Sequence, residues 1–320
     1  MNRRFALIQA LVSLVALAAV VWWASNQEAP HIPTGGDALV WIIAGVALYV
    51  VATLVRAERW HLILEHTGVN ARRSDCYALT TVGYMGNNVL PARAGEALRV
   101  VLLSPRCDAS KRTIISSIVA ERVLDVIVLL TIFVVTVYGV LDTAEVLPTD
   151  RPLLVTAIGM LLILAGAAAI WILRKHRFFE RVRNWLRPLA DSPRALLTPW
   201  GLALLAGTFL LWTVEASVYW TVARSIDLDI SIGGALYLVA LTNFVAALPA
   251  APGSIGTFDA AVLWGAHRLG ATGSMALSYV ILIRFVLYVP ITIVGLVVLV
   301  TRYGGWSRLR SATRLEASRA

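Results

Sequence analysis

Charged and amide side chains gather in two short stretches of an otherwise apolar chain. One stretch, NNVLPARAGEALR, begins at Asn87, and the other, AERVLD, ends at Asp125. Guanidinium groups beside carboxylates and amides can hold an oxyanion through charge-assisted hydrogen bonds. The candidate residues in these stretches are Asn87, Asn88, Arg93, Glu96, Arg99, Glu121, Arg122 and Asp125. We therefore expect a site for an anionic group such as a phosphate.

The second stretch has the spacing of one helical face. Glu121 and Asp125 are four residues apart and Arg122 and Asp125 are three apart, which makes them neighbours on a helix. Near the centre of a bilayer, a charged side chain that faces lipid costs roughly 2.5–3.5 kcal/mol. The sequence therefore predicts that these groups face other helices. Two interpretations remain open there, a pathway for a polar ligand or a structural Arg122–Asp125 pair.

The composition excludes a soluble globular protein. Of the 320 residues, 58% are hydrophobic and 15% are charged, and the mean hydropathy is +0.75. The apolar runs are continuous over about 20 residues and do not alternate with period two, which favours helices over a β-barrel. We predict an all-α polytopic membrane protein in which residues 1–320 form a single integral membrane domain.

Several other function classes lack their sequence signatures. The five histidines are scattered without a metal-ligand spacing, and no Gly-x4-Gly-Lys-Ser/Thr loop is present. Cys76 and Cys107 form no disulfide or metal pattern, so we expect free thiols. No activated nucleophile accompanies the carboxylates. We expect no catalytic residues, no metal and no cofactor.

The distribution of basic residues predicts the topology. Six apolar runs are long enough to span a bilayer, namely residues 5–24, 37–55, 114–138, 153–173, 199–223 and 276–301. Two further runs, 77–103 and 234–268, are interrupted by Pro and Gly. If these two enter and leave on the same side, most of the 28 basic residues lie in cytoplasmic segments. Both termini are then cytoplasmic, and the basic charge is a topology signal that argues against a nucleic-acid partner.

The two interrupted runs share a short motif. LPARAG contains Pro91 and Gly95 where LPAAPG contains Pro249 and Gly253. Broken backbone at membrane depth requires protein or a polar cavity around it, and paired breaks in two halves of a chain point to a transport site. The alternative is a pair of proline kinks in ordinary packed helices.

We therefore expect about six spanning helices and two re-entrant helical hairpins arranged as inverted repeats. The first repeat covers about residues 37–138 and the second about 199–301, with a linking helix at 153–173 and a basic cytoplasmic tail at 302–320. A helix that restarts after each break presents unpaired N–H groups to the membrane interior, which favours binding of an anion.

The second repeat carries polar residues of its own. Glu215 is expected to reach Arg284, the counterpart of Arg122, either as a gate or as a structural pair. Ser254 is expected to cap the helix that follows the second break, and Asn243 to bond loosened backbone or a head group.

Three segments resemble a known family. GYMGNNVLPARAGEALRVVLL, ERVLD and LPAAPGSIGTFDAAVLW are similar to the flippase-like membrane family that includes the membrane part of lysylphosphatidylglycerol synthases (multiple peptide resistance factors). The resemblance covers nearly the whole chain. It implies a lipid-translocating domain with re-entrant helices, in a family often associated with glycolipid, polyprenyl-linked sugar or hopanoid pathways. The soluble aminoacyl-transfer domain of the synthases does not follow here, so we expect no lysyltransferase activity.

The leading hypothesis is a flippase or transporter of a polar-headed lipid, anionic, polyprenyl-linked, phospho- or hopanoid-type, in a bacterial-type cytoplasmic membrane. Arg93, Arg99 and Arg122 would engage the anion, held in place by nearby carboxylates. The alternative is a membrane-embedded enzyme or an accessory scaffold in lipid or glycolipid biosynthesis. The expected partners are a membrane lipid and, in the alternative, enzymes of such a pathway.

Overall fold

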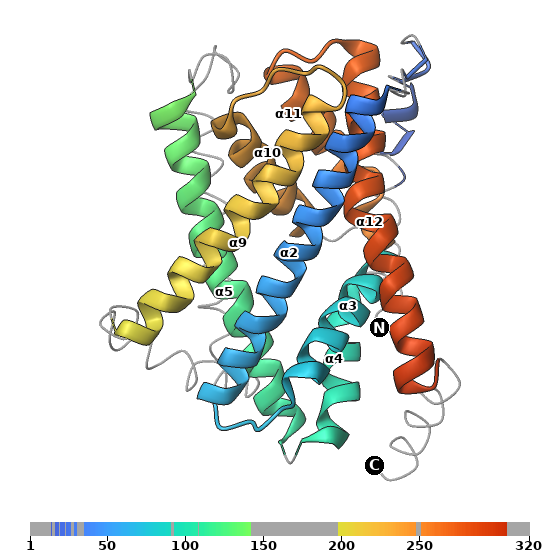
Figure 1. Ribbon diagram of the computed structural model, residues 1–320. Helices are drawn as coiled ribbons and strands as arrows, with labels where there is room; N and C mark the ends of the chain where they lie inside the picture. Colours follow the sequence, from blue (N-terminus) through green and yellow to red (C-terminus); the bar gives the residue numbers. More distant parts are fainter. Residues whose placement is uncertain are drawn as a thin grey trace.

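The computed structural model describes residues 35–90, 93–107, 109–141, 198–247 and 251–305, together with scattered positions between 14 and 30. All regular structure in these residues is helical (Figure 1). The α-helices are α2 (Gly36–His66), α3 (Arg73–Val89), α4 (Gly95–Leu103), α5 (Lys111–Val135), α9 (Pro199–Arg224), α10 (Ile232–Ala247), α11 (Thr257–Arg268) and α12 (Gly273–Tyr303). Short 3-10 turns at Ser104–Arg106 and Pro252–Ser254 and a π-helical end at Thr136–Val140 complete them.

Four of the described helices are long and apolar enough to cross a bilayer. They are α2, α5 with its π-helical end (Lys111–Val140), α9 and α12. Each coincides with one of the predicted spanning runs, so these four predictions are confirmed. Large apolar side chains are exposed on the outward faces of all four, among them Val40, Ile43, Val126, Leu210 and Ile293. Such a surface suits contact with lipid and indicates an integral membrane protein.

The predicted boundaries differ from the structure in one informative place. The run predicted for 37–55 continues as α2 to His66, so that Arg56 and Arg59 lie inside the helix and are buried. The predicted end of this span at residue 55 is therefore wrong. Both guanidinium groups meet carboxylates on other helices, and this pairing allows the helix to continue through the bundle. The predicted helix at 153–173 and most of 5–24 lie outside the described residues.

Both interrupted runs form pairs of short helices. The first pair is α3 and α4, separated between Val89 and Gly95, and the second is α10 and α11, separated by the turn that contains Pro252–Ser254. In Figure 1 the α3/α4 pair occupies the lower part of the molecule and the α10/α11 pair the upper part. Pro91 and Pro249, which belong to the two sequence motifs, lie outside the described residues.

The long helices pack in a regular order around the two short pairs. Helix α2 packs against α9 through the middle of the molecule, α3 packs against α12, and α10 packs against α5 (Figure 1). The largest apolar cluster contains the buried rings of Trp212, Tyr219, Tyr237 and Tyr279, contributed by α9, α10 and α12. A second cluster, which includes Trp60, holds α3 and α4 against α2 and α5.

Close backbone contact joins α3 to α4. A Cβ atom added at Gly95 would collide with the carbonyl oxygen of Gly83 and the backbone nitrogen of Asn87. One added at Gly86 would meet the Cα atom of Gly95 at 2.6 Å. Small residues allow the backbones of two helices to approach this closely, as they do in many membrane bundles. The structure therefore gives Gly95 a packing role at the start of α4.

This contact generates a stability prediction for Gly95→Ala. Because the obstructing atoms belong to the backbone, the pair must move apart, and we expect a loss of about 1–3 kcal/mol in the free energy of unfolding. The measurement is the thermal unfolding midpoint of purified protein in detergent. Gly207→Ala in α9 is the control, since nothing lies within 4 Å of its added Cβ. Equal midpoints for Gly95→Ala and the unsubstituted protein would contradict the packing role.

Candidate functional site

A cavity of about 110 Å³ lies where the two helix breaks come together. We call it the central cavity. Its wall combines side chains from α2, α3, α5, α9, α10, α11 and α12 with the residues of both breaks. Three arginines and one glutamate are among the lining residues, namely Arg56, Arg93, Arg122 and Glu215. The fixed charge on the wall is therefore net positive, which suits an anionic ligand.

Direct contacts join the two breaks beside this cavity. Arg93, which follows α3, donates a hydrogen bond from Nη1 to the carbonyl oxygen of Ala246 in α10, at 3.3 Å. Asn88 Nδ2 donates to Thr292 Oγ1 of α12 at 2.9 Å. Gly253 has φ = +63°, and an added Cβ would lie 3.3 Å from the carbonyl oxygen of Asn88. Glycine at this position suits both the left-handed backbone and the close approach.

Arg56 presents a buried donor to the central cavity. Its guanidinium forms an ion pair with Glu215 of α9 and lies over the rings of Tyr84 and Trp212, at 5.2 and 5.4 Å. Within the described structure, Arg56 Nη1, Asn87 Oδ1 and Trp212 Nε1 are buried without hydrogen-bond partners. Each unsatisfied buried polar group costs about 1–3 kcal/mol. Arg56, Asn87 and Trp212 all line the cavity, so a polar ligand there would lie beside these groups.

A buried ion-pair network adjoins the cavity on the α4 and α5 side. Arg59 Nη1 of α2 lies 2.7 Å from Asp125 Oδ1 and donates to Thr208 Oγ1 of α9 at 3.0 Å. Arg99 Nη2 of α4 lies 2.7 Å from Glu121 Oε2, with its guanidinium 3.8 Å from the centre of the Trp60 ring. These contacts connect four helices in the interior. They also confirm that Glu121 and Asp125 face the bundle.

Arg122 is held more loosely than Arg59 and Arg99. Its Nη1 lies 3.4 Å from Asp125 Oδ2, which confirms the local pair, and its Nε lies 3.7 Å from Glu96 Oε1 at the start of α4. Asp125 keeps Arg59 as a closer partner, so Arg122 can turn toward the cavity without leaving a buried carboxylate unpaired. Arg122 is therefore available to a ligand, whereas Arg99, paired with Glu121 and stacked on Trp60, is not.

The predicted contact between Glu215 and Arg284 is wrong. Glu215 pairs with Arg56, and Arg284 Nε lies 2.5 Å from Asp259 Oδ1 of α11. Arg284 also donates to the carbonyl oxygens of Gly253 and Ser254, at 3.2 and 3.4 Å. Residue spacing along one helix does not show which helices are neighbours, and α2 places Arg56 against Glu215. In the structure Arg284 holds the second break.

The predicted capping role of Ser254 is also wrong. Helix α11 begins at Thr257, and the Gly256 backbone N–H donates to Asp259 Oδ2 at 2.9 Å. Ser254 lies in the preceding 3-10 turn with φ = +49°. The break extends farther than expected because Gly253, Ser254 and Gly256 all adopt positive φ. Thr257 and Asp259 lie in the first turn of α11.

The structure sorts the predicted site residues into groups. Eight of them line the central cavity: Asn87, Asn88, Arg93, Arg122, Glu215, Asn243, Gly253 and Ser254. Glu96, Arg99, Glu121 and Asp125 belong to the ion-pair network, Arg284 holds the second break, and Gly95 packs against α3. Pro91 and Pro249 lie outside the described residues.

Sequence reasoning missed Arg56 and Arg59 as site residues. Their spacing of three residues on one apolar helix is the signal that identified Arg122 and Asp125. It was overlooked because positive charge at the end of an apolar run normally marks a cytoplasmic loop. The aromatic lining residues were also missed, since aromatic residues are common in any membrane helix; they are Tyr49, Tyr84, Trp212, Tyr219, Phe258 and Tyr288.

The chain is similar to a known family of membrane proteins and to several individual proteins. The model of the family described as the lysylphosphatidylglycerol synthase TM region matches residues 7–295. A UPF0104 membrane protein of Methanothermobacter thermautotrophicus is 21% identical, over 89% of this chain and 92% of that protein. One from Methanocaldococcus jannaschii is 24% identical, over 80% and 82%. The glycosyltransferase AglD of Haloferax volcanii is 25% identical over 78% of this chain, and the match spans 47% of AglD.

The ion-pair network generates a prediction for Arg59→Gln. Removing Arg59 leaves Asp125 without its closest partner in the interior, and breaking such a buried pair costs about 3–5 kcal/mol. We expect a large drop in the thermal unfolding midpoint in detergent. Arg73→Gln is the matched control, because Arg73 pairs with Glu58 at an exposed position, where an ion pair contributes roughly 0–1 kcal/mol. Similar midpoints for the two variants would show that the network does not hold the helices together.

Proposed function

The chain belongs to the family of the lysylphosphatidylglycerol synthase TM region, and from that premise we propose that it moves a lipid with an anionic head group between the leaflets of a membrane. The observation that carries the proposal is the central cavity. Arg56, Arg93 and Arg122 meet there, beside buried polar atoms that lack partners in the described residues. The cavity lies in a bundle with an apolar exterior, so the acyl chains can stay in lipid while the head group is bound.

We further propose that α3/α4 and α10/α11 are re-entrant hairpins in two inverted repeats, about residues 37–138 and 199–301. The packing order supports this arrangement. The contact of α3 with α12 corresponds to that of α10 with α5, and α2 corresponds to α9. In each unit an arginine of the long final helix faces a carboxylate of the short returning helix, Arg122 to Glu96 and Arg284 to Asp259. The opposite placement of the two pairs in Figure 1 agrees with inversion.

The proposed topology places both termini in the cytoplasm of a bacterial-type inner membrane. Outside the buried network, the basic residues of the α2–α3 and α4–α5 connections would then face the cytoplasm, as the positive-inside rule requires. Arg93 is exposed and also lines the cavity, so it marks an entrance. The entrance lies at membrane depth, where a head group can leave its leaflet without the whole lipid leaving the bilayer.

Head-group binding would proceed by exchange of ionic partners. An anion that reaches the cavity accepts hydrogen bonds from Arg93 and from Arg56 Nη1. Arg122 then exchanges its long contacts with Asp125 and Glu96 for the ligand, while Arg59 keeps Asp125 neutralised. Loss of the contact with Glu96 frees the start of α4 from α5. Binding of the head group is thereby linked to movement of the first hairpin. A site that releases its ligand on the other side of the membrane requires such a link.

The similarity to AglD favours one second candidate, a role in a glycolipid pathway as an accessory to an enzyme. That relative is named a glycosyltransferase, and this chain spans about half of its length. In this case the buried charges would be structural. Partner binding would then survive substitution of the arginines that line the cavity, and no lipid would cross between leaflets in vesicles that contain this protein alone.

The proposed function predicts that Arg93→Gln and Arg122→Gln slow lipid movement. Purified protein is placed in liposomes with phosphatidylglycerol labelled on an acyl chain, and an impermeant quencher reports transfer between leaflets. Loss of a hydrogen bond to a charged group, worth about 1.5–3 kcal/mol, corresponds to a rate reduction of about ten- to a hundredfold. Neither variant leaves a fully buried carboxylate unpaired, so both are expected to fold.

Two further variants complete this experiment. Arg56→Gln is combined with Glu215→Gln, since the single change would leave Glu215 buried without its partner. Arg73→Gln, far from the cavity lining, should transport at the unsubstituted rate. Equal rates for folded Arg122→Gln and Arg73→Gln would reject Arg122 as a ligand of the head group, and no transfer above protein-free vesicles with phosphatidylglycerol and polyprenyl phosphate probes would overturn the proposed function.

A further inference from the structure

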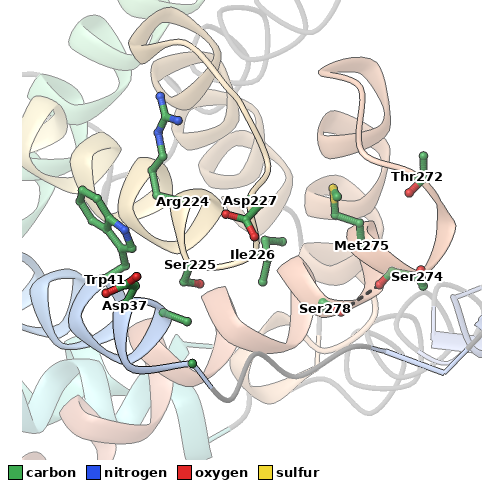
Figure 2. A pocket seen from close by; sticks show the side chains of 12 residues that line it. Asp37, Trp41, Arg224, Ser225, Ile226, Asp227, Thr272, Ser274, Met275 and Ser278 are labelled. Carbon is green, nitrogen blue, oxygen red and sulfur yellow. Dashed lines mark hydrogen bonds between the residues drawn. The ribbon is translucent and has the colours of Figure 1, made fainter.

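A second cavity lies at the opposite end of α2 from His66, and its volume is about 470 Å³. This is within the usual range for small-molecule sites, about 300–1,000 Å³. Figure 2 shows its walls, with Asp37 and Trp41 from α2 on one side, the turn at Arg224–Asp227 in the middle, and Thr272–Ser278 at the start of α12 on the other. None of these residues lines the central cavity.

The walls of the second cavity supply hydrogen-bond acceptors without partners. In the part of the chain that the structure describes, no hydrogen bond or ion pair engages the carboxylate of Asp37 or Asp227. The hydroxyl groups of Ser225 and Ser278 donate to backbone carbonyls, at 2.7 and 2.9 Å, which leaves their oxygen atoms free to accept. Acceptors are therefore present on every wall.

Donors and an apolar surface face the same space. Gly35 and Thr272, which precede α2 and α12, make no side-chain capping hydrogen bond, so the N–H groups of both helix starts are available. Arg224 is fixed at one edge by Asp229 at 3.1 Å. Trp41 is held edge-on against Trp220, with ring centres 5.5 Å apart, and with Met275 it supplies apolar contact area.

This combination selects the charge of the ligand. An anion would be repelled by Asp37 and Asp227, and a cation would be opposed by Arg224 and by the positive ends of two 31-residue helices. A hydroxyl group donates one hydrogen bond and accepts others, so a set of hydroxyls can satisfy both kinds of wall group. Their C–H faces can pack on Trp41 and Met275.

We propose that the second cavity binds an uncharged, hydroxyl-rich group of the sugar or polyol class, carried on the head group of the transported lipid. This inference rests on the proposed function, and it narrows the class of lipid that the protein would transport. The lipid would carry an anionic group for the central cavity and a neutral polyhydroxylated group for the second. In the proposed topology the second cavity lies at the outer face, where it would receive the head group after translocation.

Ligand-observed NMR on the purified full chain tests this site, in a detergent without a sugar head group. The probes are glycerol and methyl hexosides and pentosides at millimolar concentration, with inorganic phosphate and ethanolamine as charged probes. We expect saturable binding of at least one neutral probe. Asp37→Asn and Asp227→Asn should each weaken it at least fivefold, because hydrogen bonds to a charged acceptor are about twice as strong as neutral ones.

The control variant is Glu65→Gln. Glu65 is exposed near the His66 end of α2 and does not line the cavity, so binding of the neutral probe should be unchanged. Asparagine also tolerates the left-handed backbone of Asp227, φ = +57°, so the substitution there should fold. Absence of binding by every neutral probe, affinity in Asp37→Asn and Asp227→Asn equal to that of the unsubstituted protein, or displacement of the neutral probe by phosphate or ethanolamine would overturn the proposal.

The two proposals fail separately in parallel assays. If Arg122→Gln abolishes lipid transfer while no neutral probe binds, the second site is rejected and the transport function stands. If a neutral probe binds and depends on Asp37 and Asp227 while the unsubstituted protein transfers no lipid above protein-free vesicles, the site stands and the transport function is rejected.

Discussion

The structure depends on the requirement that charges inside an apolar bundle be paired. Arg59 with Asp125 and Arg99 with Glu121 connect α2, α4 and α5 where no water shell can replace a lost partner. Such pairs contribute little net stability compared with apolar packing, but breaking one is costly. They therefore specify which helices must be neighbours. That arrangement also determines the shape of the central cavity, since helices fixed by these pairs contribute side chains to its wall.

The same requirement separates structural arginines from those that can serve a ligand. Arg99 has a close carboxylate and an aromatic ring against it, and Arg59 has a carboxylate and a hydroxyl group. Arg122 shares its carboxylate with Arg59, and Arg56 retains a buried nitrogen without a partner in the described structure. A site that binds and then releases an anion requires this second type of arginine. If carboxylates neutralised all the arginines, the anion would not bind, and if positive charge were in large excess, the anion would not be released.

Much of the fold could be predicted from the sequence because hydropathy and Pro/Gly interruptions are local signals. The spans at α5, α9 and α12 and the two pairs of short helices were found in this way. Half of the predicted site residues line the central cavity, because helix breaks and charges inside an apolar chain are signals of polar sites. The ion-pair partners of the buried charges were less predictable. Glu215 meets Arg56 because α2 packs against α9, and spacing along one helix carries no information about that packing.

The two cavities place different demands on a substrate. The central cavity, with three arginines and one glutamate, favours negative charge, whereas the second combines two aspartates with one arginine and two helix starts. A lipid with a bare anionic group would be repelled by Asp37 and Asp227, and a neutral glycolipid would leave Arg56 and Arg122 without a counter-charge. A head group that satisfies both must separate its anion from a neutral hydroxyl-bearing part. In the proposed function, electrostatic selection first at one cavity and then at the other would exclude lipids that match one alone, which would give specificity beyond the affinity of either cavity.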